Sequence, residues 1–154
     1  MAFFIMHSSM MGFNQAITSN PAVLYNNEAS MPTTILIIED HLYLSLTLKR
    51  WLETKFPNCH VIEAAHGKEA IALAQHNEPN VIIVDIGPLG AEGPRLVELL
   101  KAFLPSIPIV ALANYDSETS RTRVIGSGAS AYIEKNTITS KLQPTVARLL
   151  ASAI

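Results

Sequence analysis

The sequence predicts an α/β protein in which five strands form one parallel sheet. From Pro32 onward, short apolar runs alternate with segments whose apolar residues recur at helical spacing. The run Val81–Val84 is entirely apolar and mostly β-branched, which is typical of a strand buried on both faces. Proline, asparagine or glycine lies at the boundaries between successive segments. Five βα units in this order indicate right-handed crossovers within a single sheet.

Each expected element follows from its own local pattern. The strands are apolar runs at residues 33–38, 59–64, 81–84, 107–112 and 130–133. The helices are expected at about 41–55, 67–76, 94–103, 116–125 and 140–152. The helix at 116–125 has the weakest signal, because serine and threonine are poor helix formers.

Two helices carry more specific expectations. In the first helix, one stripe is expected to face the core: Leu44, Leu48, Trp51 and Leu52. Leu42 and Leu46 lie on another face, where they are either ordinary exposed leucines or a docking surface for a partner's helices. In the last helix, Ser140 is a plausible N-cap, and Pro144 is tolerable only near the first turn.

The chain divides into an N-terminal extension and one folded domain. Residues 1–31 contain one formal charge and no sustained periodicity, so we expect a poorly ordered extension. Residues 32–154 are the expected domain, and their length suits a single core. Met31 could itself be the natural start of the folded unit.

Composition excludes several classes of function. The net charge of −2 gives no basic face for nucleic acid, so we expect no direct nucleic-acid binding. The sequence has no apolar run of the length that spans a bilayer and no secretory signal pattern, so no membrane association is expected. The single cysteine, Cys59, cannot form an internal disulfide and fits a reducing, cytoplasmic location.

Charged residues follow the ends of several expected strands. Asp85 ends the strand at 81–84, Glu39 and Asp40 follow the strand at 33–38, and Lys135 follows the last strand. An isolated aspartate at such a position is as often a loop cap as a functional group. In a parallel sheet, however, all four side chains converge on one edge, where open α/β sheets bind their ligands.

The chemistry of this group favours phosphoryl transfer assisted by a divalent cation. Oxygen-only ligands of this kind suit Mg2+. Asp85 is the expected nucleophile and would form an acyl phosphate, while Lys135 would hold a phosphoryl oxygen. The expected metal ligands are Asp40, Asp85, Glu39 partly through water, and the backbone carbonyl of Gly87.

The chain resembles the response-regulator receiver domains of two-component signalling over about residues 33–152. The motifs that carry the resemblance are Ile35-Leu36-Ile37-Ile38-Glu39-Asp40-His41, Val81 through Gly93, Ile107 through Leu112, and Gly128-Ala129-Ser130-Ala131-Tyr132-Ile133-Glu134-Lys135. The resemblance implies a flavodoxin-like fold with strand order 2-1-3-4-5. It also implies phosphotransfer onto Asp85 from a histidine kinase or a phosphotransfer protein, in a signalling domain that is not an enzyme. The opening Glu39-Asp40-His41 looks most like receivers of DNA-binding transcriptional regulators.

One position departs from the family pattern. Ala113 stands where receivers place the threonine or serine that bonds the phosphoryl group and couples it to the aromatic switch residue, here Tyr132. Asn114 follows, at a position where receivers usually have a very small residue. Its side chain could narrow access to Asp85 or supply an amide in place of the missing hydroxyl. We therefore expect phosphorylation to persist and switching to be weakened or rerouted. From sequence alone, a tyrosine at position 132 is more often a core or half-exposed strand aromatic than a switch residue.

Other interpretations stay open at this point. The family also implies a possible homodimer through the face formed by 116–125, 130–133 and 140–152. Arg121 and Arg123 are expected on a solvated helix face, and His41 and His66 at loops or helix starts. Rival functions are a degenerate receiver that only binds partners, and an aspartate-nucleophile hydrolase. The hydrolase is disfavoured because Gly87 occupies the position of its usual second acid. The chain could be a stand-alone receiver or part of a longer regulator.

Overall fold

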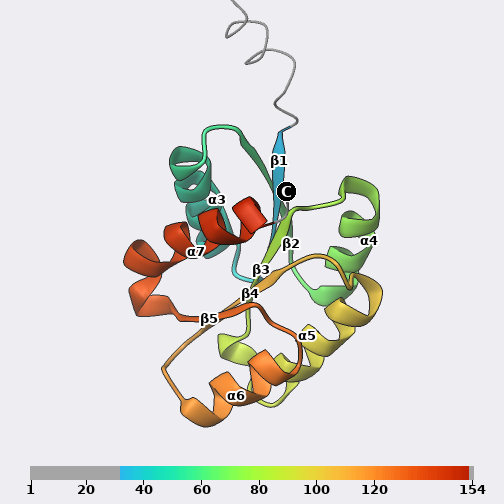
Figure 1. Ribbon diagram of the computed structural model, residues 1–154, viewed down its shortest axis with the longest axis vertical. Helices are drawn as coiled ribbons and strands as arrows, with labels where there is room; N and C mark the ends of the chain where they lie inside the picture. Colours follow the sequence, from blue (N-terminus) through green and yellow to red (C-terminus); the bar gives the residue numbers. More distant parts are fainter. Residues whose placement is uncertain (1–31, 153–154) are drawn as a thin grey trace, which may run out of the picture. The chain divides into compact units, whose positions relative to one another are not determined.

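The computed structural model describes residues 32–152 and shows one five-stranded parallel sheet. Its strands are β1 (Thr33–Ile38), β2 (Cys59–Ala64), β3 (Val81–Asp85), β4 (Ile109–Ala113) and β5 (Ala131–Glu134). They lie in the order β2-β1-β3-β4-β5 (Figure 1). The α/β class and the flavodoxin-like order are therefore confirmed. The predicted extension at residues 1–31 lies outside the described residues.

Helices cover both faces of the sheet. They are α3 (Leu42–Lys55), α4 (Gly67–Asn77), α5 (Glu92–Phe103), α6 (Glu118–Gly126) and α7 (Ile138–Ser152), with short 3-10 turns at Gly87–Leu89 and Lys135–Thr137. Helices α3 and α7 pack on one face, and α4, α5 and α6 pack on the other (Figure 1). Within residues 32–152, no helix is both long enough and apolar enough to cross a membrane.

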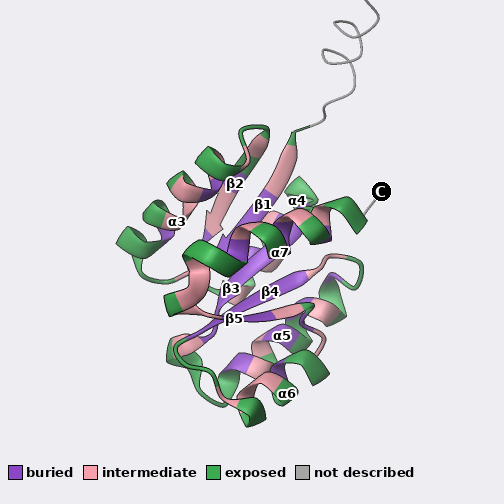
Figure 2. Ribbon diagram, turned by 60° about the vertical axis from the view of Figure 1, so that its left-hand side comes forward, coloured by how far each residue is buried: buried purple, intermediate pink, exposed green. Residues whose placement is uncertain are grey.

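Alternate residues of each strand supply the two halves of the core. Ile35 and Ile37 of β1 face α3 and α7, whereas Leu36 and Ile38 face α4, α5 and α6. The central strand β3 is buried along its whole length, as Figure 2 shows. This double burial explains why its sequence is an unbroken apolar run and not an alternating one.

Histidine and serine side chains begin three of the helices. Nδ1 of His41 accepts the backbone N–H of Leu44 at 3.4 Å, and Nδ1 of His66 accepts that of Glu69 at 3.3 Å. Oγ of Ser117 accepts the N–H of Ser120 at 3.2 Å and starts α6. Such caps satisfy backbone donors that have no partner inside the helix. The expectation that both histidines stand at helix starts is confirmed.

Two expectations about helices were wrong. Leu44 is 46% exposed, and Ser45 takes the buried position instead, with its hydroxyl donating to Glu63 Oε1 at 2.7 Å. Helix α7 begins at Ile138, so Ser140 lies inside it and donates to the Thr137 carbonyl at 3.1 Å. Pro144 therefore lies in the helix interior, where it removes one backbone hydrogen bond. Leu142 and Val146, on either side of Pro144 in the sequence, are fully buried.

A pair of leucine substitutions in α3 tests this packing. Leu52 is fully buried, so we expect Leu52→Ala to lower the free energy of unfolding by about 2–5 kcal/mol through the lost burial and the cavity left behind. Leu42 is 80% exposed, so Leu42→Ala should change it by less than about 0.5 kcal/mol. Urea unfolding of both variants measures the difference, and similar losses would contradict the assigned orientation of α3.

Candidate functional site

Asp85 is a buried carboxylate at the carboxyl end of the central strand. It is the last residue of β3 and is 8% exposed. The backbone N–H of Gly87 donates to its Oδ1 at 2.8 Å. Burying a carboxylate is costly unless donors or cations compensate it. The remaining oxygen, Oδ2, therefore needs a positive partner.

Lys135 provides that partner from the far side of β4. Its Nζ lies 2.5 Å from Oδ2 of Asp85. Because β4 lies between β3 and β5, the Lys135 side chain must extend across the end of β4 to make this ion pair. Within residues 32–152, Oδ2 is also the one buried side-chain oxygen or nitrogen without a hydrogen bond of ordinary geometry. The ammonium thus neutralises the carboxylate and leaves Oδ2 able to accept further interactions.

Glu39 shares the environment of Asp85. Burial and the neighbouring Asp85 carboxyl raise the pKa of Glu39 to about 8. Burial alone would raise the pKa of Asp85 too, but the Glu39 side chain, Lys135 and the Gly87 N–H together lower it below its ordinary value. Near neutral pH, Glu39 therefore retains a proton and Asp85 is ionised, because two adjacent carboxylates repel each other.

Asp40 lies on a different side of Asp85. It is exposed and lines a cavity of about 280 Å3 together with Asp85 and His66. Glu39 and Lys135 instead line a second, apolar cavity. In the described part of the chain, no three acidic, histidine or cysteine side chains form a group that could hold a metal ion. The structure thus brings Asp85, Lys135 and Glu39 together and leaves Asp40 beside them, across Asp85.

The residues present nevertheless fit Mg2+. The donors around Asp85 are carboxylate oxygens, which this cation prefers. Oδ2 of Asp85 can accept another interaction. The carboxyl group of Glu39 holds a proton, and a bound cation could take the place of that proton. Asp40 is exposed beside the same carboxylate and could turn toward it.

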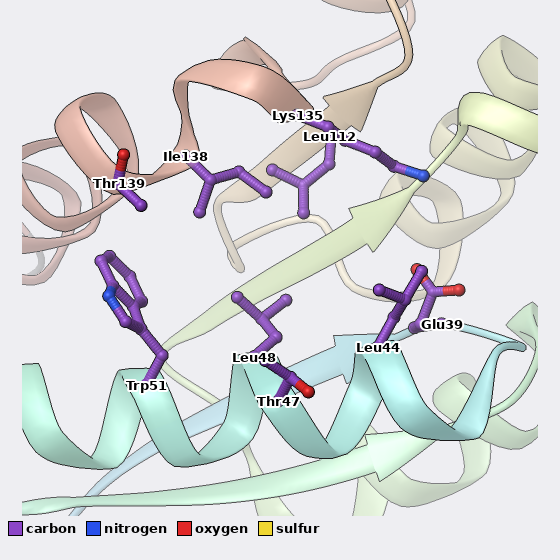
Figure 3. Close-up of a pocket in the computed structure, with 9 residues that line it drawn as sticks. All are labelled: Glu39, Leu44, Thr47, Leu48, Trp51, Leu112, Lys135, Ile138 and Thr139. Atoms are coloured by element: carbon purple, nitrogen blue, oxygen red, sulfur yellow. The ribbon is translucent and has the colours of Figure 1, made fainter.

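The second cavity is an apolar groove between α3 and α7 with a volume of about 220 Å3 (Figure 3). Its walls come from both helices and β4: Leu44, Thr47, Leu48, Trp51, Leu112, Ile138 and Thr139. Glu39 and Lys135 lie together at one end of it (Figure 3). The groove therefore runs from Trp51 and Thr139 at one end to Leu44 and the charged pair at the other (Figure 3).

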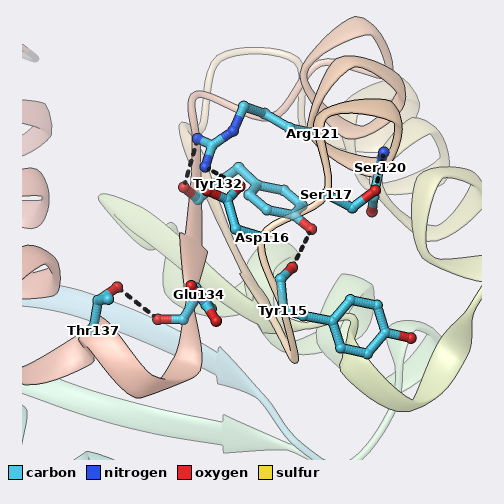
Figure 4. Close-up of polar contacts among 8 residues, drawn as sticks. All are labelled: Tyr115, Asp116, Ser117, Ser120, Arg121, Tyr132, Glu134 and Thr137. Carbon is cyan, nitrogen blue, oxygen red and sulfur yellow. Dashed lines mark hydrogen bonds and ion pairs between the residues drawn. The ribbon is translucent and has the colours of Figure 1, made fainter.

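Ala113 and Tyr132 occupy the expected switch positions. Ala113 ends β4 and is 4% exposed, so its methyl group leaves no hydroxyl at the edge of the site. Tyr132 of β5 is 6% exposed, and its hydroxyl donates to the Tyr115 carbonyl at 3.0 Å. The tyrosine is thus held inward by a bond to the loop that follows β4 (Figure 4).

Arg121 fixes Tyr132 from the other side. Its guanidinium lies 4.8 Å from the centre of the Tyr132 ring and donates to the Tyr132 carbonyl at 3.4 Å. Asp116 holds the same guanidinium at 2.7 Å (Figure 4). The side chain of Arg121 is 42% exposed, so it lies partly on the solvated helix face as expected, but its guanidinium also contacts Tyr132 of β5. No local pattern in the sequence indicates this contact, because Arg121 and Tyr132 come from different elements.

Together, the 2-1-3-4-5 sheet and the acid–lysine site at its carboxyl edge define the class of flavodoxin-like α/β domains with a charged site at the strand ends. Residues 35–147 match the family model of the response regulator receiver domain. The chain belongs to this family. Receiver domains act in two-component signalling with histidine kinases or phosphotransfer proteins and bind Mg2+ at the phosphorylation site. They are signalling domains and are generally not classed as enzymes.

Comparisons with individual proteins agree with this assignment. The response regulator protein VraR of Staphylococcus saprophyticus is 29% identical over 116 residues, which cover 75% of this chain and 56% of VraR. A DNA-binding response regulator of the LuxR family from Staphylococcus aureus has a similar fold, with a TM-score of 0.65 and 18% identity over 77% of this chain and 98% of that one. A Burkholderia pseudomallei response regulator, solved with a phosphorylated aspartic acid, a calcium ion and citrate, has a TM-score of 0.61 and 26% identity over 79% and 72% of the two chains. The resemblance to DNA-binding response regulators is confirmed, and this chain spans about half the length of VraR.

Removing the Arg121 guanidinium tests how Tyr132 is held. We expect Arg121→Ala to lower the free energy of unfolding by about 1 kcal/mol, because a cation–π contact and a hydrogen bond are lost. The ring proton shifts of Tyr132 should move at the same time. Arg123→Ala is the matched control, since Arg123 is exposed on the same helix. Urea unfolding and NMR compare the two, and equal effects on Tyr132 would contradict the assigned contact.

Proposed function

We propose that this receiver domain accepts a phosphoryl group on Asp85, in a Mg2+-dependent reaction, from a histidine kinase or a phosphotransfer protein. The observation that carries the proposal is the buried, ionised Asp85 carboxylate with the Lys135 ammonium 2.5 Å from its Oδ2. An ionised carboxylate at a strand end is a competent nucleophile. The phosphorylated aspartic acid reported for the Burkholderia pseudomallei regulator supports the same chemistry here.

The chain's residues divide the reaction between them. An oxygen of the Asp85 carboxylate attacks the phosphorus, and the bond from phosphorus to the donor's nitrogen breaks, with the electron pair remaining on that nitrogen. Lys135 stabilises the negative charge on the phosphoryl oxygens, and the Gly87 N–H orients the attacking carboxylate. Asp40, Glu39, Asp85 and the Gly87 carbonyl would hold Mg2+, which neutralises phosphoryl charge when bound. Loss of the Glu39 proton would accompany metal binding.

Labelling with a small phosphodonor tests this proposal. With acetyl phosphate and Mg2+, we expect the parent chain to gain one phosphoryl group that is absent from Asp85→Asn, because the amide is not a nucleophile. Intact-protein mass spectrometry measures the gain. Chelation of Mg2+ by EDTA should prevent it.

The matched control is Glu98→Gln, which neutralises an exposed carboxylate on α5 and should label like the parent. Labelling of Asp85→Asn to the same extent as the parent would contradict the proposal. Absence of labelling in the parent would favour the second candidate function, a receiver that only binds partners. Ala113 is the observation that makes this second candidate reasonable.

We further propose that phosphorylation of Asp85 is only weakly coupled to Tyr132. Ala113 cannot donate a hydrogen bond to the phosphoryl group, so a phosphoryl group would have no hydroxyl through which to pull the loop after β4. Tyr132 is already held inward by Tyr115 and Arg121. A ligand shifts an equilibrium only by its differential interaction with the two states, and here that difference is small.

Beryllofluoride, which mimics a phosphoryl group on aspartate, tests this weak coupling. We expect backbone NMR shift changes in the parent to stay near Asp85, with little change in the backbone shifts across residues 113–135. Ala113→Thr should extend the changes to Tyr132, because it restores a hydroxyl at the end of β4. A large rearrangement of residues 113–135 in the parent would contradict weak coupling.

We also propose which surfaces of the domain bind its partners. A donor protein would approach over the exposed leucines Leu42 and Leu46, which lie in the first turns of α3 shortly after Glu39 and Asp40 in the chain. The face formed by α6, β5 and α7 is the proposed surface for a homodimer. The likeness to VraR and to the LuxR-family regulator supports a role as the receiver part of a DNA-binding regulator.

A further inference from the structure

We propose that the carboxamide of Asn114, which already lies against Gly87, donates a hydrogen bond to the phosphoryl group on Asp85 and so supplies the donor that Ala113 lacks without moving the loop after β4. This inference rests on the proposed function, because it concerns the same phosphoryl group. It adds a residue to the site that neither the acid–lysine group nor the switch pair includes.

The contact between Asn114 and Gly87 places the carboxamide at the site. A Cβ added to Gly87 would lie 2.2 Å from Oδ1, 2.6 Å from Cγ and 2.9 Å from Nδ2 of Asn114. The carboxamide therefore fills the space that any other residue at position 87 would need. The backbone N–H of Gly87 also donates to Asp85 Oδ1 at 2.8 Å. The Asn114 carboxamide therefore lies against the residue that holds the Asp85 carboxylate.

Backbone conformation does not account for the glycine. The glycines with positive φ in the described range are Gly90 and Gly128, and Gly87 is not among them. An alanine could adopt the backbone of Gly87 without strain. The obstacle to a side chain at this position is the Asn114 carboxamide, which makes Gly87 and Asn114 a complementary pair.

The carboxamide has donors to offer. Among the hydrogen bonds between residues 32–152, none uses the side chain of Asn114, and the residue is exposed at the mouth of the site. A carboxamide carries two N–H donors, and rotation about its last bond presents either end. Ala113 offers none, and Lys135 and the Gly87 N–H are the other donors on Asp85.

The reaction gives these donors an acceptor. With acetyl phosphate, the Asp85 carboxylate attacks phosphorus, the phosphorus–oxygen bond to the acetyl group breaks, and acetate leaves with the electron pair. The phosphoryl oxygens carry negative charge throughout and lie beyond the carboxylate, on the side open to solvent. A donor placed there before reaction stabilises the charge as it is transferred.

Phosphorylation rates of single and double variants test the inference. We expect Asn114→Ala to slow labelling of Asp85 by acetyl phosphate about ten- to a hundredfold, as expected for loss of a hydrogen bond to a charged group. Asn114→Asp, which keeps the shape but loses the donor, should slow it at least as much. Adding Ala113→Thr to Asn114→Ala should recover much of the rate, because the hydroxyl then takes over.

Gly87→Ala supplies a coupling test. Alone, it should slow labelling by pushing the carboxamide away from the site. In the Asn114→Ala background, the same substitution should have little further effect. Equal effects in both backgrounds, or labelling of Asn114→Ala at the parent rate or faster, would overturn the inference. A faster rate would mean that the carboxamide only narrows access.

A structural measurement complements the rates. On addition of beryllofluoride and Mg2+, the side-chain NH2 resonances of Asn114 should shift downfield, as expected for a donor to a charged acceptor. Unchanged resonances in a parent chain that is labelled on Asp85 would reject the Asn114 role alone. A parent chain that is neither labelled nor changed by beryllofluoride would reject the proposed function together with it.

Discussion

The ion pair between Asp85 and Lys135 is the interaction on which the arrangement of the site depends. A strand buried on both faces cannot easily end in a carboxylate, because removal from water penalises the ionised form. Here the Lys135 ammonium, which reaches past β4 from the end of β5, acts together with the Gly87 N–H and the proton on Glu39 to keep Asp85 ionised. Each of these groups comes from a different part of the chain. The parallel sheet brings them to one edge because all its strands end there.

Two different structural features lie on either side of this edge of the sheet. On the side of α3 and α7, an apolar groove leads to Glu39 and Lys135. On the other side, Tyr132 is enclosed by Arg121 and the loop after β4. Ala113 stands between these two regions at the end of β4. A small apolar residue at this point leaves no side-chain hydroxyl between the Asp85 carboxylate and the tyrosine.

The closed arrangement around Tyr132 also has a physical cause. An aromatic ring beneath a guanidinium gains a cation–π contact, and its buried hydroxyl needs a hydrogen-bond partner. The Tyr115 carbonyl supplies that partner, and Asp116 orients the guanidinium. These contacts stabilise the inward position without any phosphoryl group. Exposed pairs such as Arg121–Asp116 contribute little by themselves, so the packing of the ring supplies most of the stabilisation.

Local patterns in the sequence determined the class of fold and the members of the charged site. The strands at 33–38 and 59–64 were predicted with their observed bounds, because apolar runs between turn residues specify buried strands directly. Asp85, Glu39 and Lys135 could be assigned to one site because each directly follows a strand. The tertiary structure alone decided that Arg121 lies on Tyr132, that Ser45 and not Leu44 faces the core, and that Asn114 fills the space above Gly87. These contacts join segments far apart in the chain or depend on how a helix is rotated against the sheet, and no periodicity in the sequence encodes such distances.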